Sequence, residues 1–186
     1  ITALSIMNGF DEEMRENILG VIPHIIISAE RDLAPQEWQN VEDSIIGLSE
    51  VEATAPLINA GGVAASLSGS NGVIVNGVDP KREENVSVIG NFFVKGELAN
   101  LSNNSWGVVL GESLADKLDV EMGETIDIFS PTIVINPLSA RVAFRKFEIV
   151  GIFRAGNQEI DSNLVIANID SVRALFRVRQ NYNGLR

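Results

Sequence analysis

VIPHIIISAERDLAPQEWQNVEDSIIGLSEVEATAPLI, residues 21–58, sets the order of elements from which the fold is built. Two β-rich runs, 21–28 and 51–58, flank a segment with a helical stripe. Its apolar positions are Trp38, Val41, Ile45 and Leu48. Pro35 suits the first turn of a helix, because its missing N–H would have no partner there. We therefore expect a β–α–β unit, with a helix over 35–48 crossing between two apolar strands.

Short strands dominate the chain after this unit. Glycine and asparagine are frequent between Gly61 and Gly111, and turn signals separate the apolar runs there. These signals are Gly61-Gly62, Asn71-Gly72, Asn76-Gly77 and Asp79-Pro80. Strands TIDIF, FRKFEIVGIF and LVIANI follow, with short helices expected over 112–118 and 170–177, the second capped by Asp170 or Ser171. The whole pattern predicts an α+β fold with a β-rich part after the β–α–β unit.

Upstream of the β–α–β unit, an uncharged run from Ile1 to Met7 turns abruptly acidic. The acids are Asp11, Glu12 and Glu13, and an apolar stripe runs beneath them at Phe10, Met14 and Ile18. We expect a helix over 8–19 with the acids in its first turn, where the helix dipole favours negative charge. At the other end, NYNGLR is typical of the start of a strand, so we expect the domain to continue beyond it.

Composition excludes several classes of function. The 186 residues include 14 Lys and Arg against 25 Asp and Glu, and a net charge of −11 argues against a nucleic-acid or anionic-membrane surface. The chain has no cysteine, which removes disulfides, thiol catalysis and cysteine zinc sites. Its one histidine, His24, lies in an apolar run and is interpreted as structural. No apolar run reaches the ~20 residues that span a membrane.

Catalytic motifs are also missing from the sequence. Glu159 and Asp161 could bind a cation or act as paired acids, but a solvated turn is the favoured interpretation. The serines of SLSGS lack a nucleophile elbow, and no phosphate-binding loop is present. We therefore expect no catalytic centre, no metal site and no cofactor.

One stretch reverses the local sign of charge. SPTIVINPLSARVAFRKF, residues 130–147, has no acidic residue but carries three basic ones, Arg141, Arg145 and Lys146. It is apolar at several positions, yet Pro131 and Pro137 should break a regular central strand. Two interpretations stay open: an extended hairpin arm that presents apolar and basic groups to a partner, or an ordinary hairpin packed on its own domain.

Four strings resemble, in the same order, segments of the lipoprotein-releasing ABC permeases of the LolC/LolE family. They are SIMNGFDEEMRENILGVIPHI (5–25), VNGVDP (75–80), LGESLADKLDVEMGETIDIFSP (110–131) and FEIVGIF (147–153). The first is specific to that family. The third is shared more widely among permeases of the MacB/FtsX type.

This resemblance implies a periplasmic domain between the first two transmembrane helices of an inner-membrane permease. Ile1 to Met7 would be the outer end of a transmembrane helix, and the stripe Phe10, Met14 and Ile18 would couple the membrane to the domain. Residues 8–60 and 180–186 would form a βαβ-based porter subdomain, with residues 61–179 inserted as a β-rich sabre subdomain.

The resemblance also implies partners but no cofactor. These are a cytoplasmic ATPase of the LolD type, a second permease subunit (in a LolC/LolE heterodimer or a LolF homodimer), the soluble carrier LolA and the lipoprotein cargo. Nucleic acid is not among them. The alternative is a mechanotransmission permease of the MacB/FtsX type, in efflux or cell division, which would act on a different periplasmic partner.

Residues 130–145 match the hook-like hairpin with which the carrier-docking subunit of that family engages the carrier. The contact candidates are Pro131, Ile135, Pro137, Leu138, Arg141 and Arg145. By position, Pro137 matches the hook proline and Arg145 a basic residue at the base of the hook. Phe144 and Asp127 depart from the docking subunit, which has a polar and a basic residue there. The resemblance therefore leaves a chain of the LolE type or the LolF type as alternatives.

Overall fold

The computed structural model describes residues 25–29, 33–136, 139–179 and 182–186, with the backbone alone at 132–136 and 139–141. The helix expected over 8–19 and His24 lie outside these residues. In chain order the elements are β1 (Ile27–Ser28), α2 (Pro35–Ile46), β2 (Pro56–Ala65), β3 (Ser70–Val78), α3 (Pro80–Glu83), a 3-10 helix (Ile89–Phe92), β4 (Phe93–Gly96), α4 (Asn100–Asn103), β5 (Gly107–Gly111), α5 (Glu112–Leu118), β6 (Thr125–Asn136), β7 (Ser139–Phe153), α6 (Gln158–Asn163), β8 (Leu164–Asn168), α7 (Ile169–Phe176) and β9 (Gly184–Leu185). Within the described residues no helix is long and apolar enough to cross a membrane.

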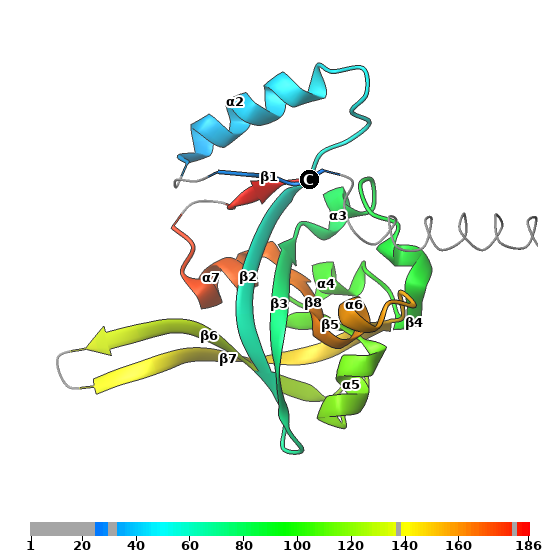
Figure 1. The fold of residues 1–186 in the computed structure, drawn as a ribbon, viewed down its shortest axis with the longest axis vertical. Coiled ribbons are helices and arrows are strands. Elements are labelled where there is room, and N and C mark those ends of the chain that lie inside the picture. The colour runs from blue at the N-terminus through cyan, green and yellow to red at the C-terminus, as the bar shows by residue number, and fades with distance from the viewer. Residues whose placement is uncertain (1–24, 30–32, 137–138, 180–181) are drawn as a thin grey trace, which may run out of the picture.

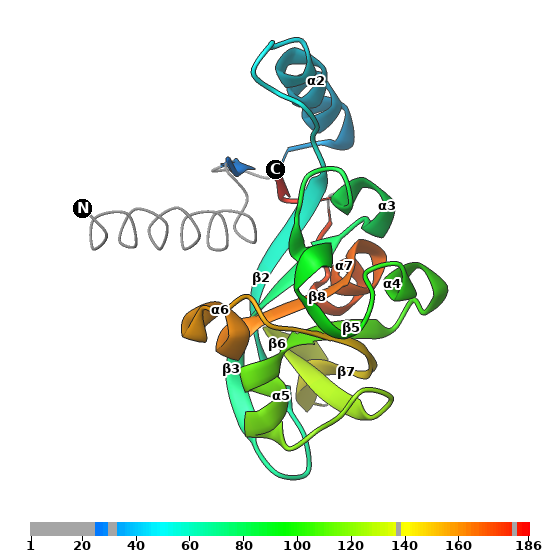
Figure 2. The same cartoon turned by 90° about the vertical axis from the view of Figure 1, so that its right-hand side faces the viewer.

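Strand pairing closes part of the sheet into a ring. β2 pairs with β3, β3 with β8, β8 with β5, β5 with β7, and β7 with β6, which returns to β2 (Figures 1 and 2). The pairs β3–β8 and β5–β7 are parallel, and the other pairs in the ring are antiparallel. A small closed sheet is filled by its own side chains. Its inward residues accordingly form the main core, together with apolar residues of α5 and α7.

A second core lies on the other face of the same strands. It takes the alternate residues Val109, Val150 and Ile166 from β5, β7 and β8, and covers them with Ile89, Leu98 and Leu101 from the segment around α4. Leu57 and Val78 extend this cluster onto one end of the β2–β3 pair. The mixed helix–strand class expected from the sequence is therefore confirmed, with apolar layers on both faces of the central strands.

The opening β–α–β unit is present, with another strand between its two strands. β1 and β2 both pair antiparallel with β9, so they run parallel to each other on either side of it. α2 makes the crossover (Figure 1). It starts at the predicted Pro35 but ends at Ile46, with Gly47 as its C-cap, so the helix predicted over 35–48 is confirmed except for its last residues. Residues 184–185 form the strand expected in NYNGLR.

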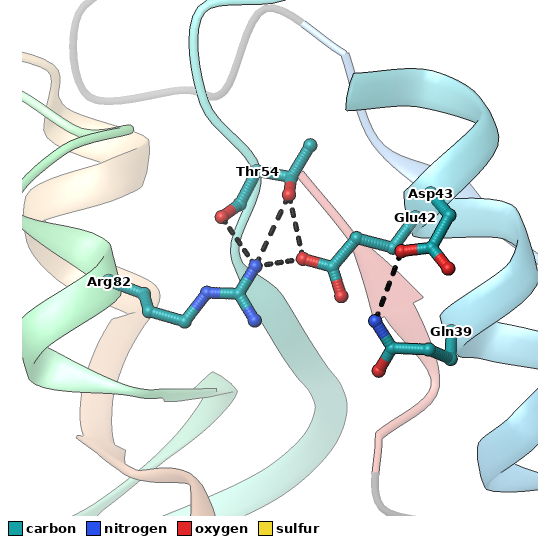
Figure 3. A network of polar contacts seen from close by, with 5 residues as sticks. All are labelled: Gln39, Glu42, Asp43, Thr54 and Arg82. Carbon is teal, nitrogen blue, oxygen red and sulfur yellow. Dashed lines mark hydrogen bonds and ion pairs between the residues drawn. The ribbon is translucent and has the colours of Figure 1, made fainter. Parts of the chain in front are cut away.

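α2 is held to the body by two buried side chains one turn apart. The Trp38 ring packs 5.3 Å from the Tyr182 ring, and the Glu42 carboxylate accepts a hydrogen bond of 2.8 Å from the Thr54 hydroxyl. Arg82 of α3 forms an ion pair with Glu42 and donates to the Thr54 carbonyl oxygen at 2.8 Å (Figure 3). We call these five residues the α2 junction. It links α2, the segment entering β2, α3 and the segment before β9.

A second ion pair continues the α2 junction on its β9 side. Glu83, next to Arg82 in α3, pairs with Arg186, and the two side chains are 0% and 5% exposed. Burial lowers the pKa of the Arg186 guanidinium to about 10, which still leaves it charged at neutral pH. The short helix α3 therefore holds α2 with one residue and the end of the chain with the next.

The strand boundaries around β2 and β3 correct the sequence prediction. The strand predicted over 51–58 begins only at Pro56 and runs on to Ala65. The predicted turns at Gly61-Gly62, Asn71-Gly72 and Asn76-Gly77 are wrong, because these residues are paired inside β2 and β3. The true turn lies at 66–69, where the Ser66 N–H donates to the Gly69 carbonyl oxygen at 2.8 Å. Only Asp79-Pro80 marks a strand end as predicted, with Asp79 capping α3.

The helices of the second half follow the sequence more closely. α5 occupies the predicted 112–118, and α7 lies where the last helix was expected. Its cap is Asn168 rather than Asp170 or Ser171, because the Asn168 side chain accepts from the Asp170 N–H at 3.0 Å. Three short helices, α3, α4 and α6, were not predicted, since four to six residues carry too little periodicity.

Candidate functional site

β6 and β7 continue beyond the ring as a two-stranded arm. Their pairing extends from Thr125 opposite Glu148 to Asn136 opposite Ser139. The arm projects from the body on the side away from α5 (Figure 1). Of the two interpretations left open by the sequence, the structure has the extended hairpin.

The arm contains an irregularity at its base. The register passes from Phe129 opposite Phe144 to Ile133 opposite Val142, so β6 has more residues than β7 between these two pairs. Pro131 lies in this bulge, where a residue need not donate a hydrogen bond to the partner strand, so the missing N–H of proline costs no hydrogen bond. The expectation that Pro131 breaks a regular strand is confirmed for the ladder, whose register shifts there. β6 continues past it, bent at the point where the arm leaves the ring.

The predicted contact residues are distributed over the whole arm. Pro131 and Arg145 are exposed near its base. Ile135 and Arg141 lie in the paired outer part, opposite Ala140 and Val134, where the structure gives the backbone alone. Pro137 and Leu138 lie outside the described residues, as do Phe10, Met14 and Ile18 of the predicted membrane-coupling helix.

Arg145 occupies one face of the arm base, together with aromatic rings. Its guanidinium carbon lies 6.0 Å from the centre of the Trp106 ring, within the range of a cation–π contact. Trp106 in turn meets Phe147 edge to face at 5.4 Å. Neighbouring residues of a strand point to opposite faces, so Phe144 lies on the other side.

That other face carries a row of residues across four strands. Gly72 of β3 lies opposite Val63 of β2, Val63 opposite Phe129 of β6, and Phe129 opposite Phe144 of β7. The rings of Phe129 and Phe144 stack at 5.2 Å. Val63 and Phe144 nevertheless remain 42% and 49% exposed. This face presents apolar side chains to solvent where a sheet would ordinarily present polar ones.

The row borders a shallow groove of roughly 650 Å³, which we call the arm-base groove. Its main lining residues are Gly61, Val63, Gly72, Ile74, Phe129, Pro131 and Val142. None of its lining residues is charged. A Cβ atom at Gly61 or Gly72 would meet nothing within 4 Å, so these two glycines form an open floor.

The groove is the uncovered continuation of a face that is covered elsewhere. Leu57 and Val78 on this face are buried in the second core, and the next pair, Asn59 and Asn76, joins its amides at 2.9 Å. Beyond them the cover stops and the groove begins. Sequence reasoning missed it because Gly61-Gly62 was interpreted as a turn. The available signal was the unbroken apolar run of residues 73–75, which is typical of a strand apolar on both faces.

The alternative site at Glu159 and Asp161 has a structural role in the turn before it. Asp161 is buried and its carboxylate accepts from the N–H groups of Ala155 at 2.7 Å and Gly156 at 3.1 Å. The predicted solvated turn is wrong for this residue, since residues 158–163 form α6. In the part of the chain that the structure describes, no three His, Asp or Glu side chains are placed to hold a metal ion.

Groups with shifted pKa values lie away from the arm-base groove. The Arg154 guanidinium hydrogen-bonds the Glu112 carboxylate, which lowers the pKa of Glu112 and raises that of Arg154. Burial raises the pKa of Tyr182 in the α2 junction, with a further contribution from the charge of Glu42. None of these groups lines the groove, so what the site offers is an apolar contact surface.

Residues 1–184 match the sequence model of the MacB-like periplasmic core domain. The chain belongs to this family. Members of the MacB-like family are periplasmic core domains, and the match covers nearly all of the chain.

Curated relatives of this MacB-like domain include named permease components. It is 28% identical to the lipoprotein-releasing system transmembrane protein LolC of Neisseria meningitidis serogroup B, over all of this chain and 45% of the relative. It is 35% identical to LolE of Haemophilus influenzae over 69% of this chain and 31% of the relative. The chain thus spans less than half the length of these relatives.

Solved structures show the same fold for this MacB-like domain. The periplasmic region of MacB from Actinobacillus actinomycetemcomitans superposes with a TM-score of 0.55 at 13% identity, covering 93% of this chain and 78% of that one. The extracellular domain of the transporter YknZ from Gram-positive bacteria gives 0.53 at 10% identity, covering 86% and 79%.

Proposed function

We propose that this chain is the periplasmic domain of an inner-membrane ABC permease that extracts lipoproteins from the inner membrane and delivers them to the soluble carrier LolA. Family membership and the relatives named LolC and LolE support this function. ATP hydrolysis belongs to a separate cytoplasmic subunit of the LolD type. A second permease subunit completes the transporter, as a LolC/LolE heterodimer or a LolF homodimer.

Within this domain, residues 8–60 and 180–186 are assigned to a porter subdomain and residues 61–179 to a sabre subdomain. The position of β9 between β1 and β2 supports grouping the end of the chain with its beginning. The predicted helix over 8–19, with Phe10, Met14 and Ile18, is assigned to transmit motion from the membrane. The domain itself works by conformational coupling and catalyses no reaction.

The observation that carries this proposal is the projecting arm. Its paired strands extend away from the body as far as the pair Asn136 and Ser139, and Arg145 stands exposed at its base (Figure 1). In a chain of charge −11, a projecting element without acids from residue 130 to 147 suits a partner with an acidic or neutral face. The arm is therefore assigned to carrier docking.

Carrier binding tests this assignment directly. The affinity of the chain for purified LolA is measured before and after combining Pro137→Ala with Arg145→Ala. If these two residues lie at the centre of the contact, the affinity should fall about tenfold or more, as it does when hot-spot residues are truncated. The matched control is Lys117→Ala, because Lys117 is exposed on α5 outside the arm. Unchanged affinity in the double variant, or no binding by the intact chain, would overturn the docking role.

A permease of the MacB/FtsX type with a different periplasmic partner is the second candidate. The likeness in fold to the MacB periplasmic region favours it. Pull-down from periplasmic extract separates the two candidates. Recovery of the lipoprotein carrier by the intact chain supports the first, and recovery of an efflux adaptor or a wall hydrolase in its place supports the second.

A further inference from the structure

Two glycines of the arm-base groove have no explanation within the fold itself. Glycine weakens the interior of a strand, and it often marks close approach by a ligand or another backbone. Gly62 is explained by close approach within the chain, because a Cβ there would lie 2.9 Å from the Phe129 carbonyl oxygen. Gly61 and Gly72 face the groove, and a Cβ at either would meet nothing within 4 Å. No atom of the described chain fills the space in front of them, so an occupant from outside it could approach the backbone closely.

The chemistry of the groove limits what this occupant can be. It lies on a face of the sheet, whereas the backbone N–H and C=O groups of paired strands lie in the plane of the sheet and not toward its face. Its polar lining residues are Ser130 and Asn163, and both are already engaged in hydrogen bonds or contacts. A polypeptide backbone placed here would lose hydrogen bonds to water without replacing them. A hydrocarbon chain would lose none.

Charge complementarity points the same way. The chain carries −11, yet no charged side chain lines the groove, so an ionic headgroup or a charged peptide finds no counter-charge there. The volume of roughly 650 Å³ lies within the ~300–1,000 Å³ typical of ligand sites. Each methylene buried against Val63, Ile74 and Val142 would tighten binding about fourfold.

We propose that the arm-base groove binds a hydrocarbon chain, and that its occupant in the permease is an acyl chain of the lipoprotein cargo. This inference rests on the proposed function for the identity of the cargo. The groove lies at the foot of the arm, on the face of β7 opposite Arg145. The acyl chain would thus be held beside the element assigned to the carrier, shielded from water while it changes hands.

Photochemical labelling of the 186-residue chain tests the proposal. The probe is a synthetic triacylated lipopeptide with a diazirine in one acyl chain, and labelled residues are mapped by mass spectrometry. The expected result is labelling concentrated on β2 and β3 around Val63 and Ile74. Gly61→Val and Gly72→Val fill the floor with a side chain that has space around it and prefers strands. Displacing two methylenes predicts a fall in labelling of roughly fifteenfold.

The matched control is Gly90→Val. Gly90 is exposed, a Cβ there also meets nothing within 4 Å, and it lies outside the groove. Its labelling should equal that of the native chain, and thermal unfolding should show all three variants folded. Equal labelling of the groove variants, or none in the native chain, would overturn the proposal. So would weaker carrier binding by the groove variants without acyl labelling, because the groove would then be a protein contact.

The test is separable from that of the proposed function. Carrier affinity responds to Pro137 and Arg145, whereas acyl labelling responds to Gly61 and Gly72. Carrier affinity that stays unchanged in the Pro137 and Arg145 variant, while labelling falls in the glycine variants, would contradict carrier docking alone. Carrier affinity that falls in the first variant, while labelling stays unchanged in the glycine variants, would contradict only the acyl-chain groove.

Discussion

The two ends of β2 reverse the usual placement of polar and apolar side chains. At Pro56 the strand enters the α2 junction, where Glu42 and the neighbouring Glu83 are buried. At Ala65 it reaches the arm base, where Val63 and Phe144 are about half exposed. A buried charge is stable only beside a specific partner, so the charges at the first end hold particular segments of the chain together. Exposed apolar side chains mark a surface that another molecule can bind. One end of β2 therefore connects elements of the domain, and the other end offers a binding surface.

Among changes at these two ends of β2, we expect replacement of Glu83 to lower the stability of the domain most. Glu83→Gln leaves the buried guanidinium of Arg186 without its counter-charge, and removing one partner of a buried pair lowers the free energy of unfolding by about 3–5 kcal/mol. Urea unfolding measures the change. Combining Glu83→Leu with Arg186→Met removes both charges, and most of the stability should return. If the double variant unfolds as easily as Glu83→Gln, the ion pair contributes stability beyond compensating its two buried charges.

Glu42 should give a smaller loss, because Arg82 remains partly exposed to water. Glu42→Ala removes the charged acceptor shared by Thr54 and Arg82, and hydrogen bonds to charged groups contribute about 1.5–3 kcal/mol. Amide hydrogen exchange should show the loss first in α2. The neighbouring Asp43→Ala is the matched control, since Asp43 is exposed and bonds only to Gln39 within the helix among the residues drawn in Figure 3. Equal effects at the two positions would contradict a specific junction.

Glycine substitutions sharpen the comparison at the other end of β2. Gly61→Ala should raise the free energy of unfolding by roughly 0.5–1 kcal/mol, because it relieves the entropy cost of glycine in a strand without meeting another atom. Gly62→Ala should lower it by about 1–3 kcal/mol, since its Cβ meets the Phe129 carbonyl oxygen. Thermal unfolding of both variants compares adjacent residues. A stabilising Gly62→Ala would mean that β2 and β6 separate more readily than their pairing implies.

The smallest effect belongs to an ion pair at the surface. Arg154 lowers the pKa of Glu112, so the folded-state pKa lies below the unfolded value. The resulting stabilisation is present above the unfolded pKa and is lost as the pH falls through the folded one. Stability measured against pH should show a difference between the native chain and Glu112→Gln at neutral pH that disappears in acid. In Arg154→Met, the pKa of Glu112 determined by NMR titration should return toward its ordinary value.

Sequence reasoning located elements whose signals are local. α5 was predicted at its observed bounds and α2 at its observed start, because apolar spacing and a first-turn proline act within a few residues. The turns placed at Gly61 and Asn76 failed for the opposite reason. Whether glycine ends a strand or sits inside it depends on partners far along the chain, and β3 pairs with β8 some ninety residues away.

The same limit applied to the candidate site. Pro131 and Arg145 were identified as arm residues from their charge and context in the sequence, although Pro131 interrupts only the ladder and not the strand. The apolar run of residues 73–75 could have indicated a strand with two apolar faces, but not the groove itself, because its walls come from four strands that meet only in the folded sheet. Asp161 was assigned to solvent because no sequence pattern reports that its carboxylate would bind the turn at Ala155 and Gly156.

The insertion of β9 between β1 and β2 also fixes an order of events during synthesis. Pro56 pairs with Leu185, so this contact closes a loop of well over a hundred residues. The ring strands can pair as they leave the ribosome, but β1 and the entry of β2 have no neighbour until residues 184–185 have been made. Until then Trp38 lacks the ring of Tyr182, and Glu83 lacks its partner Arg186. α2, among the first elements translated, is thus among the last to be secured.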